Sequence, residues 1–323
     1  MRKCNVKNRI WVSITFSMIL MIMLFCSGCT VKKEQPTTEA VVKEKPRIKQ
    51  KKVTIDSEEI RITDYTYNEF GDITLEVTTY GNGDPLFYYE YVYDEDGNLL
   101  EEYRGKSADD KQIDNRYEYE DGKLMVETVY SFDGSIMDIY YYTYNDEGLL
   151  INKKKESEDG YVYREYKYEY DDEGRVSHMT DLFYEYRTEY TYDEEGRTVL
   201  EEAYLESGDF SYGRKMVYGE YGITDSYFYS SKTESHEKTL YDKKGRRVSA
   251  VSIDKDGKEH VTWTWEYDDA GNMIHSVGTK GYEYTAEYNE YGDPVKVHDV
   301  CTDPLRNAGT FDTIEEYEYI YYE

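Results

Sequence analysis

The segment Tyr166-Lys167-Tyr168-Glu169-Tyr170-Asp171-Asp172-Glu173-Gly174-Arg175-Val176 contains one complete copy of the pattern that decides the fold. Three tyrosines alternate with charged residues, and a period of two is typical of a β-strand, whose successive side chains point to opposite faces. Asp171 can bond to backbone groups of its own turn, and Gly174 can adopt the left-handed conformation that closes a hairpin loop of three to four residues. The segment therefore predicts a strand, a turn and a second strand.

This motif recurs ten times between residue 55 and the end of the chain. Its glycines are Gly71, Gly97, Gly122, Gly148, Gly174, Gly196, Gly222, Gly245, Gly271 and Gly292, spaced by 26, 25, 26, 26, 22, 26, 23, 26 and 21 residues. Such regularity indicates that one structural unit is reused. A second, looser turn lies between many successive copies, for example at Asp133-Gly134 and Asp256-Gly257. Ten hairpin repeats and a closing strand near residues 317–322 predict an all-β antiparallel meander of about twenty strands.

The number of strands limits the shape of such a sheet. Neighbouring strands lie about 4.8 Å apart, so twenty of them would form a flat sheet roughly 100 Å wide. Sheets twist, and open sheets rarely exceed about ten strands without curling or splitting. We therefore expect a curled or coiled single sheet.

The motif resembles the YD repeats of the RHS family, in which a Tyr-Asp-x-x-Gly turn precedes an Arg, Asn or Lys and an aliphatic residue. That tail is present here as Asn98-Leu99, Lys123-Leu124, Arg175-Val176 and Asn272-Met273. The resemblance implies hairpins that join into a long curling sheet, which forms a hollow shell in large members. Several copies here replace the aspartate, and no large toxin domain follows, so a complete shell is not expected.

The first 29 residues have the layout of a bacterial secretory signal peptide. Positive charges precede an apolar run over residues 10–25, and Cys26-Ser27-Gly28-Cys29 follows it. The ending resembles the recognition site of lipoprotein signal peptidase, which implies that Cys29 becomes the first mature residue and carries a lipid. An uncleaved membrane anchor and a plain secretory signal are the alternatives. Each alternative predicts that the rest of the chain lies outside the cytoplasm, and the lipoprotein interpretation places it at the bacterial cell membrane.

Residues 30–54 are predicted to form a basic, flexible tether, and residues 55–323 the repeat domain. The tether contains Pro36 and Pro46, is rich in Lys and Thr, and can lie against anionic lipid headgroups. The whole chain has a net charge of −29, and its first 52 residues carry +9. Residues 53–323 therefore carry a net charge of −38. A domain this acidic repels phosphate backbones, so DNA and RNA are not expected as partners.

The sequence contains no motif that identifies an enzyme. The five histidines lie in different repeats without metal-ligand spacing, and no phosphate-binding glycine loop or nucleophile elbow is present. Most acidic residues recur at equivalent positions, which favours solvated turns over a catalytic pair. Partial calcium-loop patterns at residues 94–98 and 254–257 lack the closing glutamate. We expect no catalytic residues, no cofactor and no bound metal, and we expect Cys301 to be an inert thiol.

The remaining candidates for function are aromatic ladders, in which three rings share one strand face. The simpler interpretation is that these rings are cross-strand pairs that hold the sheet together. The alternative is that one ladder stays exposed as a platform for sugars or a protein. Trp263, Trp265 and Tyr267 are the candidate binding residues, because Trp263 and Trp265 are the only tryptophans outside the signal segment.

These features favour the function of a cell-surface lipoprotein. It would attach to the membrane through Cys29, and its repeat sheet would serve as a non-enzymatic binding or scaffold module for envelope glycans or surface proteins. Two alternatives remain open: an envelope carbohydrate-active hydrolase, and an accessory component of an RHS-type toxin system. An enzyme should have one cleft where the repeat symmetry breaks and buried acids converge.

Overall fold

The computed structural model describes residues 46–230, 232–279, 281–302 and 311–320, all of which belong to one compact unit spanning Lys43–Glu323. The predicted signal peptide, Cys29 and residues 30–45 of the predicted tether lie outside the described residues. Within the described part of the chain, no helix is long and apolar enough to cross a membrane.

The described residues form 22 β-strands, and consecutive strands pair antiparallel throughout. The strands are β1 (Arg47–Ile55), β2 (Glu59–Tyr67), β3 (Ile73–Tyr80), β4 (Pro85–Tyr93), β5 (Leu99–Gly105), β6 (Gln112–Glu120), β7 (Lys123–Tyr130), β8 (Ile136–Tyr144), β9 (Leu150–Glu156), β10 (Val162–Tyr170), β11 (Val176–Asp181), β12 (Tyr186–Tyr192), β13 (Thr198–Leu205), β14 (Phe210–Gly219), β15 (Gly222–Ser230), β16 (Glu234–Tyr241), β17 (Arg247–Ile253), β18 (Glu259–Tyr267), β19 (Met273–Gly278), β20 (Tyr282–Tyr288), β21 (Pro294–Cys301) and β22 (Phe311–Ile320).

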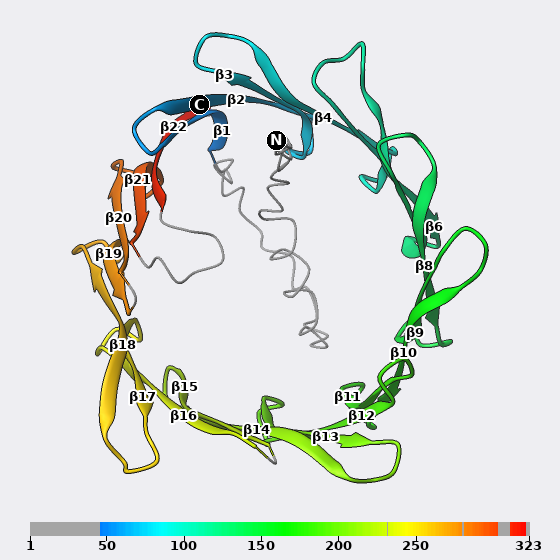
Figure 1. Ribbon diagram of the computed structural model, residues 1–323, viewed down its shortest axis with the longest axis vertical. Helices are drawn as coiled ribbons and strands as arrows, with labels where there is room; N and C mark the ends of the chain where they lie inside the picture. Colours follow the sequence, from blue (N-terminus) through cyan, green and yellow to red (C-terminus); the bar gives the residue numbers. More distant parts are fainter. Residues whose placement is uncertain (1–45, 231, 280, 303–310, 321–323) are drawn as a thin grey trace, which may run out of the picture. The chain divides into compact units, whose positions relative to one another are not determined.

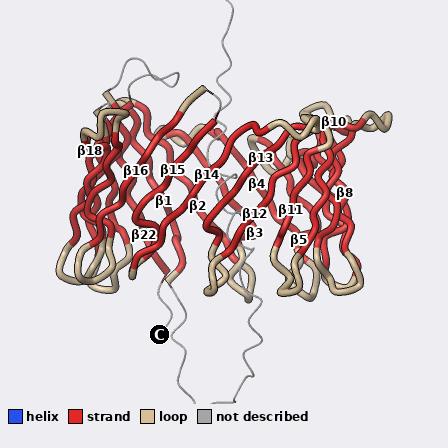
Figure 2. The backbone as a smooth tube through the Cα atoms, turned by 90° about the horizontal axis from the view of Figure 1, so that it is seen from below, coloured by secondary structure: helices blue, strands red, loops and turns tan. Residues whose placement is uncertain are grey.

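The sheet closes into a barrel, because β1 pairs antiparallel with both β2 and β22 (Figure 1). The expectation of an antiparallel all-β meander is confirmed, but the expectation of a curled or coiled single sheet was wrong, because the 22 strands form a closed barrel. A meander of this length would otherwise leave two unpaired edges, and closure removes both of them. Turns line both ends of the wall of strands (Figure 2).

The motif turns have the predicted geometry. The backbone N–H of Asp171 donates to the carbonyl of Arg175 at 2.9 Å, and that of Gly174 donates to the carbonyl of Asp171 at 3.0 Å. Gly174 has φ of 77°, in the left-handed region that favours glycine. The Asp171 carboxylate accepts the backbone N–H of Arg175 at 2.9 Å. The turn chemistry that the sequence indicates is therefore present.

Each of the ten motif hairpins contains a β-bulge at its tyrosine. In the example quoted above, Glu169 pairs with His178 but Tyr170 pairs with Val176, so β11 has one residue more than β10 at this point. Such a bulge leaves backbone groups outside the regular ladder. The next motif tyrosine satisfies one of them, since the Tyr192 hydroxyl donates to the carbonyl of Val176 at 2.7 Å.

This hydrogen bond recurs around the barrel. The other hydroxyl–carbonyl pairs are Tyr67–Ile48, Tyr93–Ile73, Tyr144–Leu124, Tyr170–Leu150, Tyr218–Thr198, Tyr241–Ile223, Tyr288–Met273 and Tyr319–Pro294. Each bond joins the end of one repeat to the repeat before it. The motif tyrosines thus stabilise contacts between neighbouring hairpins at the ends of the strands, beside the motif turns.

An eleventh repeat is divided between the two ends of the described chain. Tyr319 in β22 pairs with Ile48 in β1, and the register shifts between Ile48 and Gln50. Tyr319 and Ile48 therefore occupy the positions of Tyr170 and Val176, and Arg47 occupies that of Arg175. The Arg47 guanidinium lies 5.6 Å from the centre of the Tyr67 ring, as the motif arginines lie over the next motif tyrosine. The barrel consists of eleven repeats, of which the sequence pattern reveals ten.

The strand that closes the barrel comes from the segment predicted to be a tether. Residues 47–54 belong to β1, so the predicted boundary at residue 54 is too late by this strand. Its basic residues pair with acids of β22: Lys49 with Glu318, Lys51 with Glu315 and Lys52 with Glu316, with N–O distances of 2.7, 2.7 and 2.5 Å. These three lysines, which the sequence predicts to be in a solvated tether, instead form ion pairs with an acidic neighbouring strand.

Few side chains in the described wall are fully buried. Among the aromatic residues that the structure describes, only Tyr88 and Tyr142 are buried, and small residues such as Ala203 account for much of the rest. Cys301 is also buried, with 1% of its surface exposed. The sheet is therefore held chiefly by its ladders and by half-buried rings, as the large share of tyrosine suggests.

Candidate binding surface

The barrel wall has one face that carries the motif tyrosines, which we call the tyrosine face. In β10, Tyr166, Tyr168 and Tyr170 lie on this face and are half-buried, whereas Lys167 and Glu169 on the opposite face are exposed. The alternation predicted from the sequence is present. Both faces nevertheless carry charged residues, because the tyrosine face also includes acids and lysines from the odd-numbered strands.

The three predicted binding residues lie together on the tyrosine face of β18. The rings of Trp263 and Trp265 are stacked with centroids 6.1 Å apart, and both side chains are half-buried. Tyr267 lies under the Arg246 guanidinium, whose carbon is 4.6 Å from the ring centre. The two tryptophans are therefore accessible in part, and Tyr267 is held by a cation–π contact.

Trp263 also has a structural role that the sequence does not reveal. Its ring covers Gly278 on β19, where an added Cβ would lie 2.4 Å from the indole. The Tyr282 ring packs against it with centroids 4.9 Å apart. The indole N–H is buried and has no hydrogen-bond acceptor among the described residues. Trp263 thus fills space above a glycine, while Trp265 is the better candidate for contact with a ligand.

An arc of glutamates lies between the tyrosines of β2 to β8. Tyr91 donates to the carboxylate of Glu76 at 3.1 Å, Asn115 donates to Glu102 at 2.6 Å, and Tyr142 donates to Glu127 at 2.8 Å. Burial raises the pKa of the Glu76 and Glu102 carboxyls above their usual range.

These acids differ from the solvated turn acids that the repeat pattern predicts. The strand register would have identified these glutamates, because Glu76 pairs with Tyr65 and Glu102 pairs with Tyr91 across neighbouring strands. A residue opposite a tyrosine in a ladder shares its face. The sequence reveals this relationship only once the register is known.

A lysine occupies the corresponding position in β9. The Lys153 ammonium lies 5.3 Å from the centre of the Tyr140 ring and 5.0 Å from that of Tyr142. Burial lowers its pKa from the usual value, and the nearby Glu127 acts in the opposite direction. The arc of glutamates therefore ends at a cation.

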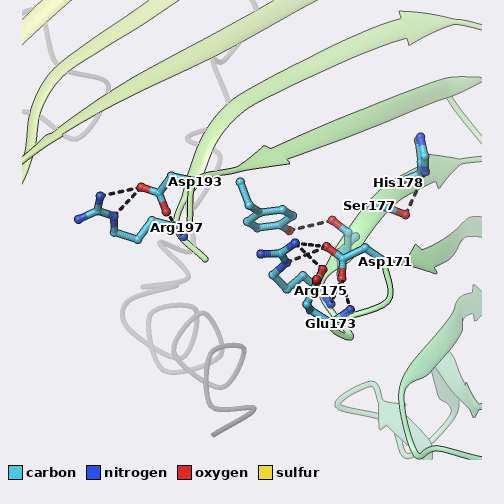
Figure 3. A network of polar contacts seen from close by, with 9 residues as sticks. Asp171, Glu173, Arg175, Ser177, His178, Asp193 and Arg197 are labelled. Atoms are coloured by element: carbon cyan, nitrogen blue, oxygen red, sulfur yellow. Dashed lines mark hydrogen bonds and ion pairs between the residues drawn. The ribbon is translucent and has the colours of Figure 1, made fainter. Parts of the chain in front are cut away.

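The rim of motif turns is braced by arginine side chains (Figure 3). Arg175 forms ion pairs with Asp171 and Glu173 at 2.7 Å each, and Arg197 pairs with Asp193 at 2.7 Å in the next turn. The Arg175 guanidinium also lies 4.7 Å from the centre of the Tyr192 ring. Each arginine thus connects its own turn to the next repeat.

The five histidines are distributed over the wall, as their spacing in the sequence indicates. Each lies beside a carboxylate, and the shortest contacts are His298–Asp312 at 2.7 Å and His236–Asp225 at 2.8 Å. Within the described residues, no group of three or more His, Cys, Asp or Glu side chains is arranged to hold a metal ion.

A groove of about 670 Å³ lies where β11, β12 and β13 meet their turns. This is where the spacing of the motif glycines falls from 26 to 22 residues. Three glutamates line it, Glu185, Glu189 and Glu206, and all three are exposed.

The comparisons with known proteins show the fold and do not show a family. No protein-family model matches the chain, and no curated protein matches it. Among solved structures, TcdB2-TccC3 aligns with a TM-score of 0.51 and 15% identity, covering 82% of this chain and 15% of that chain. The complex TcdB2-TccC3-Cdc42 aligns with a TM-score of 0.50 and 15% identity, covering 75% and 14%. The chain thus spans about one seventh of these longer chains, and at this identity the likeness is one of fold alone.

Proposed function

We propose that this protein is a non-enzymatic binding or scaffold module that a lipid on Cys29 holds at the bacterial cell surface. The observation that supports binding is the tyrosine face, on which rings and carboxylates alternate from strand to strand between β2 and β8. Aromatic rings beside carboxylates are suited to sugar rings, whose apolar faces stack and whose hydroxyls donate hydrogen bonds. We propose envelope glycans as the first ligand class and surface proteins as the second.

The charges of the wall support a barrel that stands in water above the membrane. Lys167 and Glu169 are exposed in mid-strand on one face, and Glu102 and Lys153 lie on the other. A barrel wall that faces lipid carries an apolar band on its outer side. Charged residues on both faces instead suit a domain that is anchored by a lipid chain outside itself.

A binding screen with cell-wall fragments and glycan arrays tests the proposal. The chain should include residues 47–55, because a version that begins at residue 56 lacks the closing strand. The informative variant is Trp265→Ala, with Trp263 retained because its ring covers Gly278. Loss of binding in this variant, with an unchanged circular dichroism spectrum, would support a glycan-binding module; no binding to any glycan would contradict it and favour a protein-facing scaffold.

A second candidate function is an accessory role in an RHS-type toxin system. The fold likeness to TcdB2-TccC3 favours it. The test is co-purification of the lipoprotein with proteins encoded by neighbouring genes. A stable complex with a toxin-type partner would support this candidate, and a chain that purifies alone would count against it.

A further inference from the structure

The groove between β11, β12 and β13 is formed by a shortened repeat. β11 has six residues and β12 has seven, whereas β10 has nine. The turn between them is stiffened by Asp181, whose carboxylate accepts the backbone N–H groups of Phe183 and Tyr184 at 3.0 and 3.2 Å. The residues that line the groove include Leu182, Glu185, Arg187, Glu189, Tyr204 and Glu206.

The apolar part of the groove is built on a fixed aromatic ring. The Tyr204 hydroxyl donates to Glu202 at 3.1 Å, and the Phe210 ring meets the Tyr204 ring edge-on with centroids 5.9 Å apart. Leu182, in the turn that follows β11, is 42% exposed. An exposed aliphatic side chain and an aromatic ring that is already held in place give the groove an apolar lining, so no rearrangement is needed when a ligand binds.

The charged part of the groove is predominantly negative. Glu185, Glu189 and Glu206 are exposed, and Arg187 is the one cation among the lining residues. The Arg187 Nε atom lies 3.8 Å from Glu189, and both side chains are nearly half exposed, at 49% and 47%. An exposed pair at this distance is weak in water. The groove therefore attracts cations. The net charge of residues 47–323 adds to that attraction: it is −34, because the four basic residues of β1 before residue 53 reduce the −38 of residues 53–323.

From these features we propose that the groove binds a linear aliphatic polyamine. Its methylene chain would lie against Leu182 and Tyr204, and its ammonium groups would meet the carboxylates of the glutamates. An aromatic ring beside carboxylates is a favourable setting for an organic cation. The volume of about 670 Å³ lies within the range of small-molecule sites.

Other occupants fit the groove less well. An anionic ligand would be repelled, because three carboxylates and only one guanidinium line the groove. Extended peptides commonly bind by adding a strand to a free sheet edge, and all 22 described strands are paired on both sides. A short flexible chain that carries only methylene and ammonium groups matches the lining without needing backbone contacts.

Calorimetric titration of spermidine into the full-length chain tests this proposal. We expect Glu206→Gln and Tyr204→Leu each to raise the dissociation constant about tenfold, which corresponds to about 1.4 kcal/mol. Arg187→Gln should lower it, because the substitution removes a like charge from the groove. Trp265→Ala is the matched control on another part of the barrel and should leave spermidine binding unchanged.

The alternative to a site is diffuse condensation of cations on an acidic protein. Mg²⁺ at equal charge concentration should then displace spermidine completely, and the groove variants should behave as the unaltered chain does; either result would overturn the proposal. Binding of polylysine with equal sensitivity to the groove variants would overturn the small-molecule assignment in favour of a basic peptide. These outcomes are independent of glycan binding, which is tested through Trp265.

Discussion

The hydroxyl of Tyr67 donates a hydrogen bond to the backbone carbonyl of Ile48 at 2.7 Å. In eight other places a motif tyrosine makes this bond to the repeat before it, and here it reaches a repeat whose two strands come from opposite ends of the described chain. The divided repeat therefore obeys the same rule as the continuous ones. Its two strands are joined by a ladder and by ion pairs, whereas the two strands of every other repeat are also joined by a covalent turn.

The first prediction concerns the closing strand. Removal of residues 30–55 should destabilise the barrel and expose two sheet edges, on β2 and β22, which promotes aggregation. Removal of residues 30–45 alone is the matched control, because it leaves β1 intact. Thermal unfolding and size-exclusion chromatography measure both effects. Equal melting temperatures and monomeric elution for the two truncations would contradict closure by β1.

A second prediction tests the hydrogen bond between repeats. Tyr170→Phe removes the hydroxyl that donates to the carbonyl of Leu150 at 2.7 Å. Because that carbonyl is left without this donor, the free energy of unfolding should fall by about 1–2 kcal/mol. Tyr161→Phe is the control, since its side chain is 60% exposed on a turn. Urea denaturation gives both values, and an equal, negligible loss in the two variants would argue against a stabilising role.

The pH dependence of stability follows from the glutamate arc. Burial raises the folded-state pKa of Glu76 and Glu102 above the unfolded value. The folded protein therefore binds protons more readily, so these residues favour folding below the unfolded pKa and lose that contribution as the pH rises through the folded pKa. Glu76→Gln with Glu102→Gln should increase the free energy of unfolding at pH 7 and have little effect near pH 4.

Urea denaturation at the two pH values provides this measurement. Glu95→Gln with Glu147→Gln is a suitable control, because both carboxylates are exposed in motif turns. A double variant of the arc that is less stable than the unaltered protein at pH 7 would show that hydrogen bonds from Tyr91 and Asn115 outweigh the cost of burying the charges.

The last prediction concerns the contact between Trp263 and Gly278. Gly278→Ala places a Cβ 2.4 Å from the indole ring, so the ring must move or the strands must separate. We expect a red shift of tryptophan fluorescence and a loss of about 1–3 kcal/mol of stability from overpacking. In a Trp263→Ala background the same substitution should cost much less, and additive costs in the double-mutant cycle would exclude the contact as the cause.

The local structure of this protein is determined by its sequence. Alternating tyrosines, a turn aspartate and a glycine suited to positive φ specify each hairpin, because strand pairing, turn hydrogen bonds and left-handed glycine act within about ten residues. Trp263, Trp265 and Tyr267 were correctly placed on one face for the same reason. The glutamate arc was not recognised, since its burial depends on which residue lies opposite Tyr65 and Tyr91 in the ladder.

Closure of the barrel was decided only by the tertiary structure. Residues 47–52 resemble a solvated basic tether in isolation, and their partners Glu315, Glu316 and Glu318 lie more than 260 residues away. Whether the two ends meet depends on the twist and bulge of every hairpin summed around the wall. The total twist cannot be read from any single repeat. The local sequence therefore determines the hairpins, whereas closure of the barrel and the divided eleventh repeat depend on all 22 described strands together.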